Sequence, residues 1–140
     1  MAEDTVVTRR NFLRAASTAT AVAALSGIRP APAGAQGRPI KIGYVSPQTG
    51  PLAGFGEADT FVVGGVRKAL GKGLTIRDRT HPVEILVRDS QSDPNRAAEV
   101  ASRLILSDKI DLMLVASTPE TTNPVSDQCE VNGTPAVSSV

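Results

Sequence analysis

Four short apolar runs divide the chain after residue 39 and alternate with longer segments of helical periodicity. The runs lie at Ile40–Ser46, Val83–Arg88 and Ile110–Ala116, and from Pro135 onward. Their length and their content of Val, Ile and Leu are typical of β-strands. Between them, apolar residues recur at spacings of three and four, which indicates amphipathic helices. The pattern predicts helices over Glu57–Leu70, from Asp93–Pro94 onward, and over about Thr122–Val131.

Local signals add detail to three of these elements. Asp93 and Pro94 are expected to be the N-cap and first residue of their helix, because Asp accepts free N–H groups and Pro suits the first helical position. Val83–Arg88 alternates apolar and charged residues, which favours the edge of a sheet. The continuous run Ile110–Ala116 instead favours a strand that is covered on both faces.

Two further segments are interpreted as structural. Gly64 and Gly65 lie inside the first predicted helix, where we expect them to allow close packing on the sheet. Thr75–Pro82 is expected to be a polar connection, and its histidine, His81, is expected to be solvated.

The order of elements is β-α-β-α-β-α-β with short connections. This order predicts an α/β fold with three layers, in which a parallel sheet lies between helices and the crossovers are right-handed. Because the sequence stops inside the fourth strand, residues 36–140 are expected to form an incomplete domain, the front part of a longer protein.

The first 35 residues are predicted to be an export signal. The pair Arg9–Arg10 precedes two large apolar residues, and residues 15–28 carry no charge and are only mildly apolar. That segment suits the h-region of a signal peptide and is shorter than the roughly 20 residues of a membrane span. Overlapping A-x-A sites follow, with cleavage expected after Ala35. The segment resembles a twin-arginine signal, so the twin-arginine export machinery is an expected partner and the periplasm the expected location.

Charge and cysteine content argue against several classes of function. Of 15 basic and 14 acidic residues, four basic and two acidic ones precede residue 36, which leaves eleven against twelve and a net charge of −1. This balance gives no reason to expect a nucleic-acid partner. The single cysteine, Cys129, excludes an internal disulfide and a cysteine-based metal cage. It is expected to be a small buried residue, and neither a cofactor nor a metal is expected.

The sequence lacks the motifs of common enzymes. It has no HExxH motif and no Ser/His/Asp set with a credible nucleophile turn. The glycines Gly50, Gly54 and Gly56 do not have the spacing of a dinucleotide-binding loop, and no GK[ST] follows them. The protein is therefore predicted not to be an enzyme.

Small polar groups gather where the predicted strands end. Eight residues are predicted to bind a ligand: Thr49, Gly50 and Phe55 after the first strand, Ser117, Thr118 and Thr121 after the third, and Ser138 and Ser139 in the fourth. Ligands of open α/β sheets bind outside the carboxyl ends of the strands. Hydroxyl groups and helix-start N–H groups suit a carboxylate or another polar head group, and an aromatic ring can close over an apolar tail. The alternative role for each Ser or Thr is helix capping.

Three segments carry a family resemblance: KIGYVSPQTGPLAGFG, VEILVRDSQSDPNRAAEVASRLI and STPETTNPVSDQCEVNG. They include a T-G-P-x-A-x-x-G loop and a D-x-x-x-D-P-x-x-A step. In these segments the chain resembles type I periplasmic solute-binding proteins of ABC transporters, of the branched-chain (leucine/isoleucine/valine) amino-acid-binding type. The resemblance covers Pro39–Val140. It implies two α/β lobes that close on a ligand in the cleft between them, of which this chain supplies most of the N-terminal lobe.

The resemblance also implies roles for single residues. Phe55 matches the aromatic residue that covers the ligand in many members, and Ser117–Thr121 matches the loop that contacts the ligand carboxylate. Ser138 and Ser139 match the start of the next contact loop. Relatives often have a serine near the position that Pro119 occupies here, so the resemblance does not imply an amino acid as the solute. An aromatic acid, an amide or a urea-like solute is an equal alternative.

These observations favour one function and leave two alternatives open. The favoured function is the solute-binding component of an ABC importer, with a small polar solute and the permease subunits as the partners that the family implies. The first alternative is an exported α/β enzyme whose catalytic residues lie beyond residue 140. The second is a two-lobe sensor domain coupled to signalling.

Overall fold

The computed structural model describes residues 36–139, and the predicted export signal with its cleavage site lies outside this range. The elements in chain order are β1 (Ile40–Ser46), η1 (Ala53–Phe55), α2 (Asp59–Ala69), β2 (Leu74–Ile76), β3 (Arg79–His81), β4 (Val83–Asp89), α3 (Pro94–Leu106), β5 (Leu112–Ala116), α4 (Pro119–Val131) and β6 (Ala136–Ser139). Within this range, no helix has the length and apolar character needed to cross a membrane.

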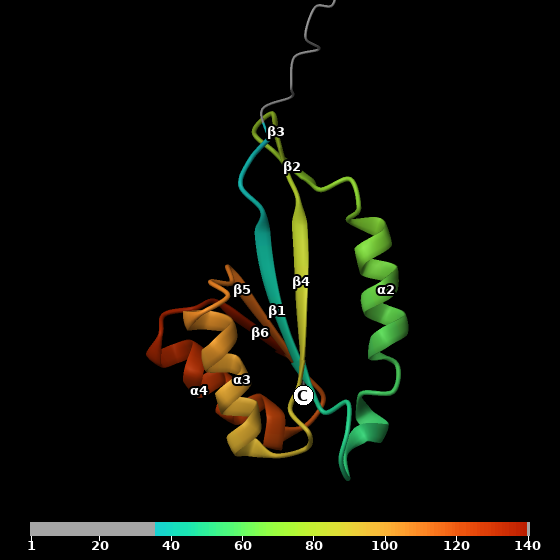
Figure 1. Ribbon diagram of the computed structural model, residues 1–140, viewed down its shortest axis with the longest axis vertical. Helices are drawn as coiled ribbons and strands as arrows, with labels where there is room; N and C mark the ends of the chain where they lie inside the picture. The colour runs from blue at the N-terminus through green and yellow to red at the C-terminus, as the bar shows by residue number, and fades with distance from the viewer. Residues whose placement is uncertain (1–35, 140) are drawn as a thin grey trace, which may run out of the picture. The chain divides into compact units, whose positions relative to one another are not determined.

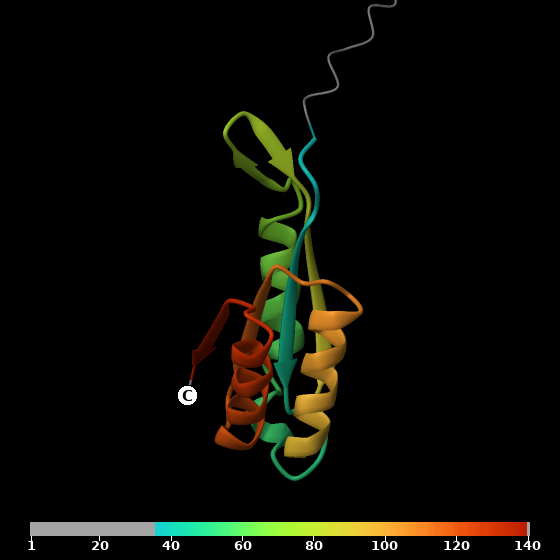
Figure 2. The same ribbon diagram turned by 90° about the vertical axis from the view of Figure 1, so that its left-hand side faces the viewer.

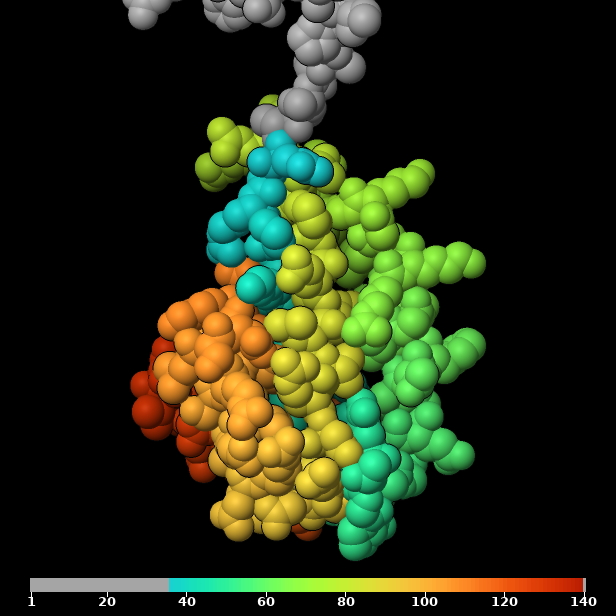
Figure 3. Space-filling view, in the orientation of Figure 1, coloured from blue at the N-terminus to red at the C-terminus, as the bar shows by residue number. Residues whose placement is uncertain are grey.

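The main sheet has four parallel strands in the order β4-β1-β5-β6. β1 lies between two neighbours, and its Tyr44 is opposite Val87 of β4 on one side and Leu114 of β5 on the other. β4 is an edge strand, as its alternating pattern predicts. Figure 3 shows the atoms of β4 along the surface between α3 and α2. The predicted α/β fold with a parallel sheet is therefore confirmed.

Helices lie on both sides of this sheet. α3 and α4 pack against one face, whereas α2 lies on the other side, next to β4 (Figures 1 and 2). The chain moves from β1 outward to β4 and then back across β1 to β5. Crossovers of one hand then place α2 and α3 on opposite faces, which produces the three predicted layers.

The hydrophobic core lies between the sheet and the pair α3 and α4. Its members are Val45, Ala97, Val100, Ala101, Leu104, Ile105, Met113, Val115, Val125 and Cys129. The α3 members recur at spacings of three and four, so one side of the helix is buried. Full burial of a Val, Leu or Met side chain stabilises the fold by about 1.5–3 kcal/mol. Cys129 is 2% exposed, as predicted, and burial raises the pKa of its thiol.

The buried side of α2 is smaller than predicted. Phe61 is 86% exposed and Val62 is 53% exposed. The prediction for Gly64 and Gly65 is wrong, because a Cβ built at either position meets no described residue within 4 Å apart from the adjacent backbone of α2 itself. The two glycines are on the side of the helix turned away from the sheet, so close packing on the sheet does not explain them.

The connection after α2 is not the polar loop predicted for Thr75–Pro82. It forms an antiparallel hairpin of β2 and β3, joined by the two residues Arg77 and Asp78. Both turn residues have positive φ, 47° and 65°, as a tight two-residue hairpin turn requires. The turn lacks the glycine that usually marks such a hairpin. Nδ1 of His81 donates a 3.0 Å hydrogen bond to the carbonyl oxygen of Arg38.

The two later helices test the capping predictions. Asp93 caps α3, because its Oδ1 accepts a 2.7 Å hydrogen bond from the N–H of Arg96, which confirms the predicted N-cap. α4 begins at Pro119, three residues before the predicted start. Pro at the first helical position is favourable there, as it is in α3. The earlier start leaves Pro124 inside the helix rather than in its first turn.

β5 is covered less evenly than predicted. Met113 and Val115 are at most 2% exposed and face α3 and α4. Leu114 on the opposite face is only half-buried. The prediction of a strand covered on both faces is therefore wrong for the described residues, because α2 lies over β4 rather than over β5.

Candidate functional site

The candidate site is at the carboxyl ends of the parallel strands, which together form one edge of the sheet. The loops that follow β1, β4 and β5 lie at this edge, and α2, α3 and α4 begin there (Figure 1). All eight predicted ligand-binding residues lie in these loops, in the first turn of α4 or in β6. The parallel topology thus brings segments from residues 49 to 139 to one end of the sheet.

Asp89, the last residue of β4, connects the loops after β1 and β4. Its Oδ1 accepts hydrogen bonds from the N–H groups of Gln48 (2.9 Å), Thr49 (3.2 Å) and Gln91 (2.8 Å). Its Oδ2 accepts a 2.6 Å bond from the hydroxyl of Thr49. Burial alone would raise the pKa of Asp89, but the hydrogen bonds from Thr49, Gln91 and Gln48 outweigh it and hold the pKa below its ordinary value. Asp89 is therefore an ionised anchor for both loops.

Gly50 lies against the β4–α3 loop and has φ +91°. A Cβ at this position would be 2.6 Å from the carbonyl oxygen of Gln91, so only glycine fits without a shift of the backbone. The hydroxyl of Ser92 donates to the carbonyl oxygen of Thr49 at 2.7 Å and accepts from the N–H of Leu52 at 3.0 Å. Thr49 and Gly50 are thus held by contacts within the protein.

The loop after β5 combines a strained residue with buried hydroxyl groups. Ser117 has φ +114°, a region that non-glycine residues rarely adopt. Thr118 precedes α4, and its carbonyl oxygen accepts from the N–H groups of Thr121 (3.1 Å) and Thr122 (2.8 Å). Thr118 is 4% exposed and Thr121 is fully buried. Ser117 is half-buried and is the residue of this loop best placed to meet a solute.

Ser90 joins the loop after β4 to the first turn of α4. It is fully buried, and its Oγ is 3.0 Å from Oγ1 of Thr121. Its N–H donates to the carbonyl oxygen of Ser46 at the end of β1 (2.9 Å). Sequence reasoning missed Asp89, Ser90 and Ser92, although the D-x-x-x-D-P step that begins at Asp89 was a visible signal.

The remaining predicted residues are at the surface. Phe55 ends the short helix η1 and is 62% exposed. Ser138 and Ser139 are exposed in β6, where they pair with Val115 and Ala116 of β5. These side chains are free to meet a ligand, in contrast to Thr49 and Thr121, whose hydroxyl groups already have partners within the protein.

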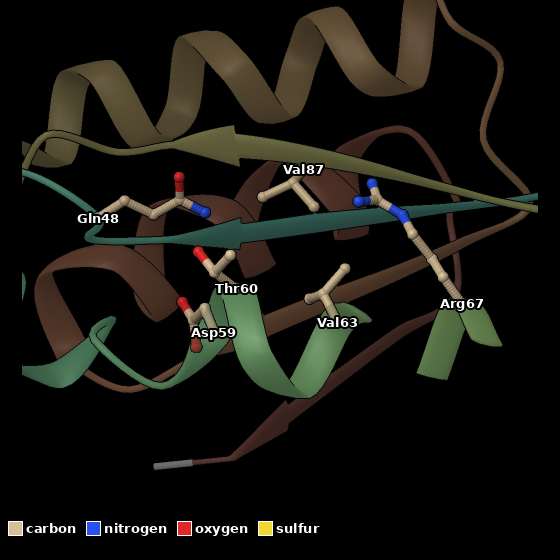
Figure 4. A pocket seen from close by; sticks show the side chains of 6 residues that line it. All are labelled: Gln48, Asp59, Thr60, Val63, Arg67 and Val87. Carbon is tan, nitrogen blue, oxygen red and sulfur yellow. The ribbon is translucent and has the colours of Figure 1, made fainter. Parts of the chain in front are cut away.

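A cavity of about 190 Å³, lined by polar and apolar side chains, lies nearby between α2 and the sheet. Figure 4 shows its lining: Gln48 after β1, Val87 of β4, and Asp59, Thr60, Val63 and Arg67 of α2. Arg67 reaches from the helix toward the strands and donates a 2.7 Å bond to the carbonyl oxygen of Ile85. This contact covers a carbonyl group of the edge strand. Among residues 36–139, no group of three or more His, Cys, Asp or Glu side chains could hold a metal ion.

The fold and the gathered loops define a lobe of the open α/β class, in which ligands bind outside the carboxyl ends of the strands. Comparison with protein families makes this assignment specific. Residues 39–140 match the family of periplasmic binding proteins, and the chain belongs to that family. The curated protein sequences include no match to this chain.

Solved structures of solute-binding proteins share the fold. One is the branched-chain amino acid transporter substrate binding protein LivJ from Streptococcus pneumoniae in complex with isoleucine (24% identity, TM-score 0.59). Others are the leucine binding protein LivK from Thermotoga maritima (25%, 0.57) and an ABC transporter solute binding protein from R. palustris in complex with benzoate (23%, 0.58). Each similarity covers 71% of this chain but only 28%, 27% and 27% of those proteins. The chain thus spans little more than a quarter of their length.

These comparisons decide two of the predictions. The resemblance to type I periplasmic binding proteins is confirmed at the level of family and fold. The family and its structural neighbours are solute-binding proteins and not enzymes, so the prediction of a non-enzymatic protein is confirmed as well.

Proposed function

We propose that the chain is part of the extracytoplasmic solute-binding component of an ABC importer. The observation that carries this proposal is the match of residues 39–140 to the periplasmic binding protein family. The family implies a small-molecule solute, a periplasmic location and permease subunits as partners. Residues 36–140 would form part of the N-terminal lobe, and the solute would bind in a cleft against a second lobe.

The side chains and helix start at the carboxyl ends of the strands support this location of the cleft. The exposed ring of Phe55 can cover an apolar part of a solute. Ser117 and the start of α4 offer hydroxyl and N–H donors to a polar head group, and the positive end of the helix dipole favours a negative charge there. Ser138 and Ser139 extend the row of hydroxyl groups along the edge. Thr49, Gly50, Thr118 and Thr121 complete the proposed set of ligand-binding residues, the first two and Thr121 chiefly through the loops that they shape.

The proposed solute carries a carboxylate or an amide group. Two of the similar structures hold isoleucine and benzoate, which share a carboxylate and differ in their apolar parts. Neutral donors at a helix start suit a carboxylate oxygen or an amide oxygen. An amino acid, an aromatic acid and an amide are thus the solutes to test.

We also propose that the protein reaches the periplasm through the twin-arginine route. The support is the order of Arg9–Arg10, the weakly apolar residues 15–28 and the A-x-A sites before cleavage after Ala35. Replacing both arginines with lysine and fractionating the cells should leave the precursor in the cytoplasm. Unchanged accumulation in the periplasm would refute this route.

Binding is tested on the protein extended to the full length of its structural neighbours. We expect isothermal titration calorimetry to detect at least one of isoleucine, leucine, benzoate and benzamide at micromolar affinity, which corresponds to about −8 kcal/mol. Phe55→Ala should weaken this binding about tenfold, because it removes a covering aromatic ring. Phe61→Ala is the matched control, since Phe61 lies on the outward side of α2. No heat from any solute, or equal effects of the two variants, would contradict the proposal.

A further inference from the structure

The segment Asp89–Ser92 contacts the loop after β1 and the first turn of α4, which carry several of the predicted ligand-binding residues. It begins with the last residue of β4, the edge strand, and holds none of those residues itself. Toward β1, the carboxylate of Asp89 binds two N–H groups and one hydroxyl group of Gln48 and Thr49, at 2.6–3.2 Å. The loop after β1 is thus fixed by a charged side chain from another strand.

Ser92 strengthens the connection to the loop after β1. Its hydroxyl bridges the carbonyl oxygen of Thr49 and the N–H of Leu52. Leu52 directly precedes η1, which ends in the exposed Phe55. The position of this aromatic residue therefore depends on a contact made 40 residues away in sequence.

Ser90 provides the connection to α4. Its hydroxyl is 3.0 Å from that of Thr121, and both residues are fully buried. Its N–H binds the carbonyl oxygen of Ser46, the last residue of β1. One buried serine thus fixes the first turn of α4 relative to the end of β1.

We propose that Asp89, Ser90 and Ser92 are positioning residues for solute binding. They hold the loop of Phe55 and the first turn of α4, which begins two residues after Ser117, in one relative geometry before the solute arrives. Groups ordered in advance do not lose freedom on binding, so affinity rises without a direct contact. The inference rests on the proposed solute-binding function and adds residues that none of the ligand-binding predictions contain.

The test compares two aspartate variants in the full-length protein. Asp89→Asn removes the charge that holds the loop after β1. Asp111→Asn is the matched control. Asp111 also accepts hydrogen bonds from a backbone N–H (Lys41, 2.9 Å) and from a side chain (Arg38), but it lies at the start of β5, at the opposite end of the strand from the candidate site. Asp89→Asn should lower the affinities for two solutes of different shape by the same factor. We expect this factor to be about two to ten, which corresponds to the free energy of one hydrogen bond. Asp111→Asn should leave both affinities unchanged.

A double-mutant cycle separates positioning from general stabilisation. If Ser90 acts through Thr121, Ser90→Ala should weaken binding in the wild-type protein and have no further effect in a Thr121→Val background. Additive losses, or wild-type affinity in Asp89→Asn and Ser90→Ala, would overturn the inference. Ser92→Ala, at a half-buried position, provides the same comparison if Asp89→Asn does not fold. Absence of solute binding in the wild-type protein would instead refute the proposed function.

Discussion

The phenolic hydroxyl of Tyr44 donates a 2.8 Å hydrogen bond to Oδ1 of Asp59 and so joins β1 to the first turn of α2. Asp59 is 8% exposed, and among the described residues its Oδ2 has no hydrogen-bond partner. The carboxylate thus depends on Tyr44 for its side-chain contact. This pair links the sheet to α2 at the end where the strands finish.

The pair predicts an unusual titration of the only tyrosine in the chain. Burial, together with the bond to Asp59, raises the pKa of Tyr44 from 10.0 to about 12. Absorbance at the phenolate band should therefore stay low in the folded chain near pH 11 and rise at about pH 10 in the urea-unfolded chain. Because the raised pKa favours the neutral phenol in the fold, this stabilisation is complete below pH 10 and is lost as the pH rises toward 12. Phenolate formation in the folded chain near pH 10 would contradict the prediction.

Tyr44→Phe should destabilise the fold at neutral pH. The substitution keeps the ring but leaves the buried carboxylate of Asp59 without the hydroxyl group, and an unsatisfied buried acceptor costs about 1–3 kcal/mol. The free energy of unfolding from urea titration measures the effect. The double variant Tyr44→Phe with Asp59→Asn should lose less than the sum of the single changes. Strict additivity would show that the hydrogen bond contributes nothing.

Acid should weaken the connection made by Asp89. Its pKa is below the ordinary value in the fold, so its ionised form contributes stability above the unfolded pKa of about 3.9. That contribution is lost as the pH falls through the folded pKa. The difference in unfolding free energy between wild type and Asp89→Asn should therefore become smaller as the pH falls from 5 through the folded pKa of Asp89. A difference that does not change with pH would show that the charge is not the stabilising feature.

Local sequence signals predicted much of the fold because their causes are local. The bounds Ile40–Ser46 agree with β1 at both ends, and the N-cap at Asp93 is where a capping side chain followed by proline placed it. The edge position of β4 also follows from its own alternating residues. The hairpin turn at Arg77 and Asp78 was missed, because two non-glycine residues at positive φ have no strong sequence signal.

Residue type predicted where the candidate site lies but not which groups are free to bind. Thr49 was chosen for its hydroxyl group, but that hydroxyl donates to Asp89, 40 residues further along the chain. Thr121 is likewise engaged by Ser90, 31 residues before it. A sequence pattern shows the donors and acceptors of each segment, whereas their pairing depends on which loops the sheet brings together. Phe55 is exposed, and its role as a ligand-covering residue stays a prediction.

A pair of glycines tests how closely the loop after β1 packs against the loop after β4. Gly50→Ala should destabilise the fold by about 1–3 kcal/mol, because a side chain is strained at positive φ and meets a backbone oxygen. Gly54→Ala is the matched control in the same loop, since a Cβ built there meets no described residue within 4 Å apart from its chain neighbours. It should change the unfolding free energy by less than about 0.5 kcal/mol. Equal effects of the two substitutions would contradict the close approach to Gln91.

The exposed apolar side of α2 predicts how residues 36–140 behave on their own. Val62 and Val66 are 53% and 40% exposed, and both line an apolar cavity of about 120 Å³ between α2 and the sheet, opposite Leu114. Val137 on the edge strand β6 is 57% exposed. Adjacent apolar surface of this kind, together with an open strand edge, favours self-association.

Residues 36–140 produced alone should therefore bind a hydrophobic dye such as ANS and sediment as a mixture of species. Val62→Asp should reduce both signals, because it places a charge in the apolar cavity. Val131→Asp is the matched control: Val131 is 82% exposed at the end of α4, away from that cavity, so its substitution should change neither signal. A monomeric sedimentation profile without dye binding for residues 36–140 would show that the exposed valines do not form a cohesive surface.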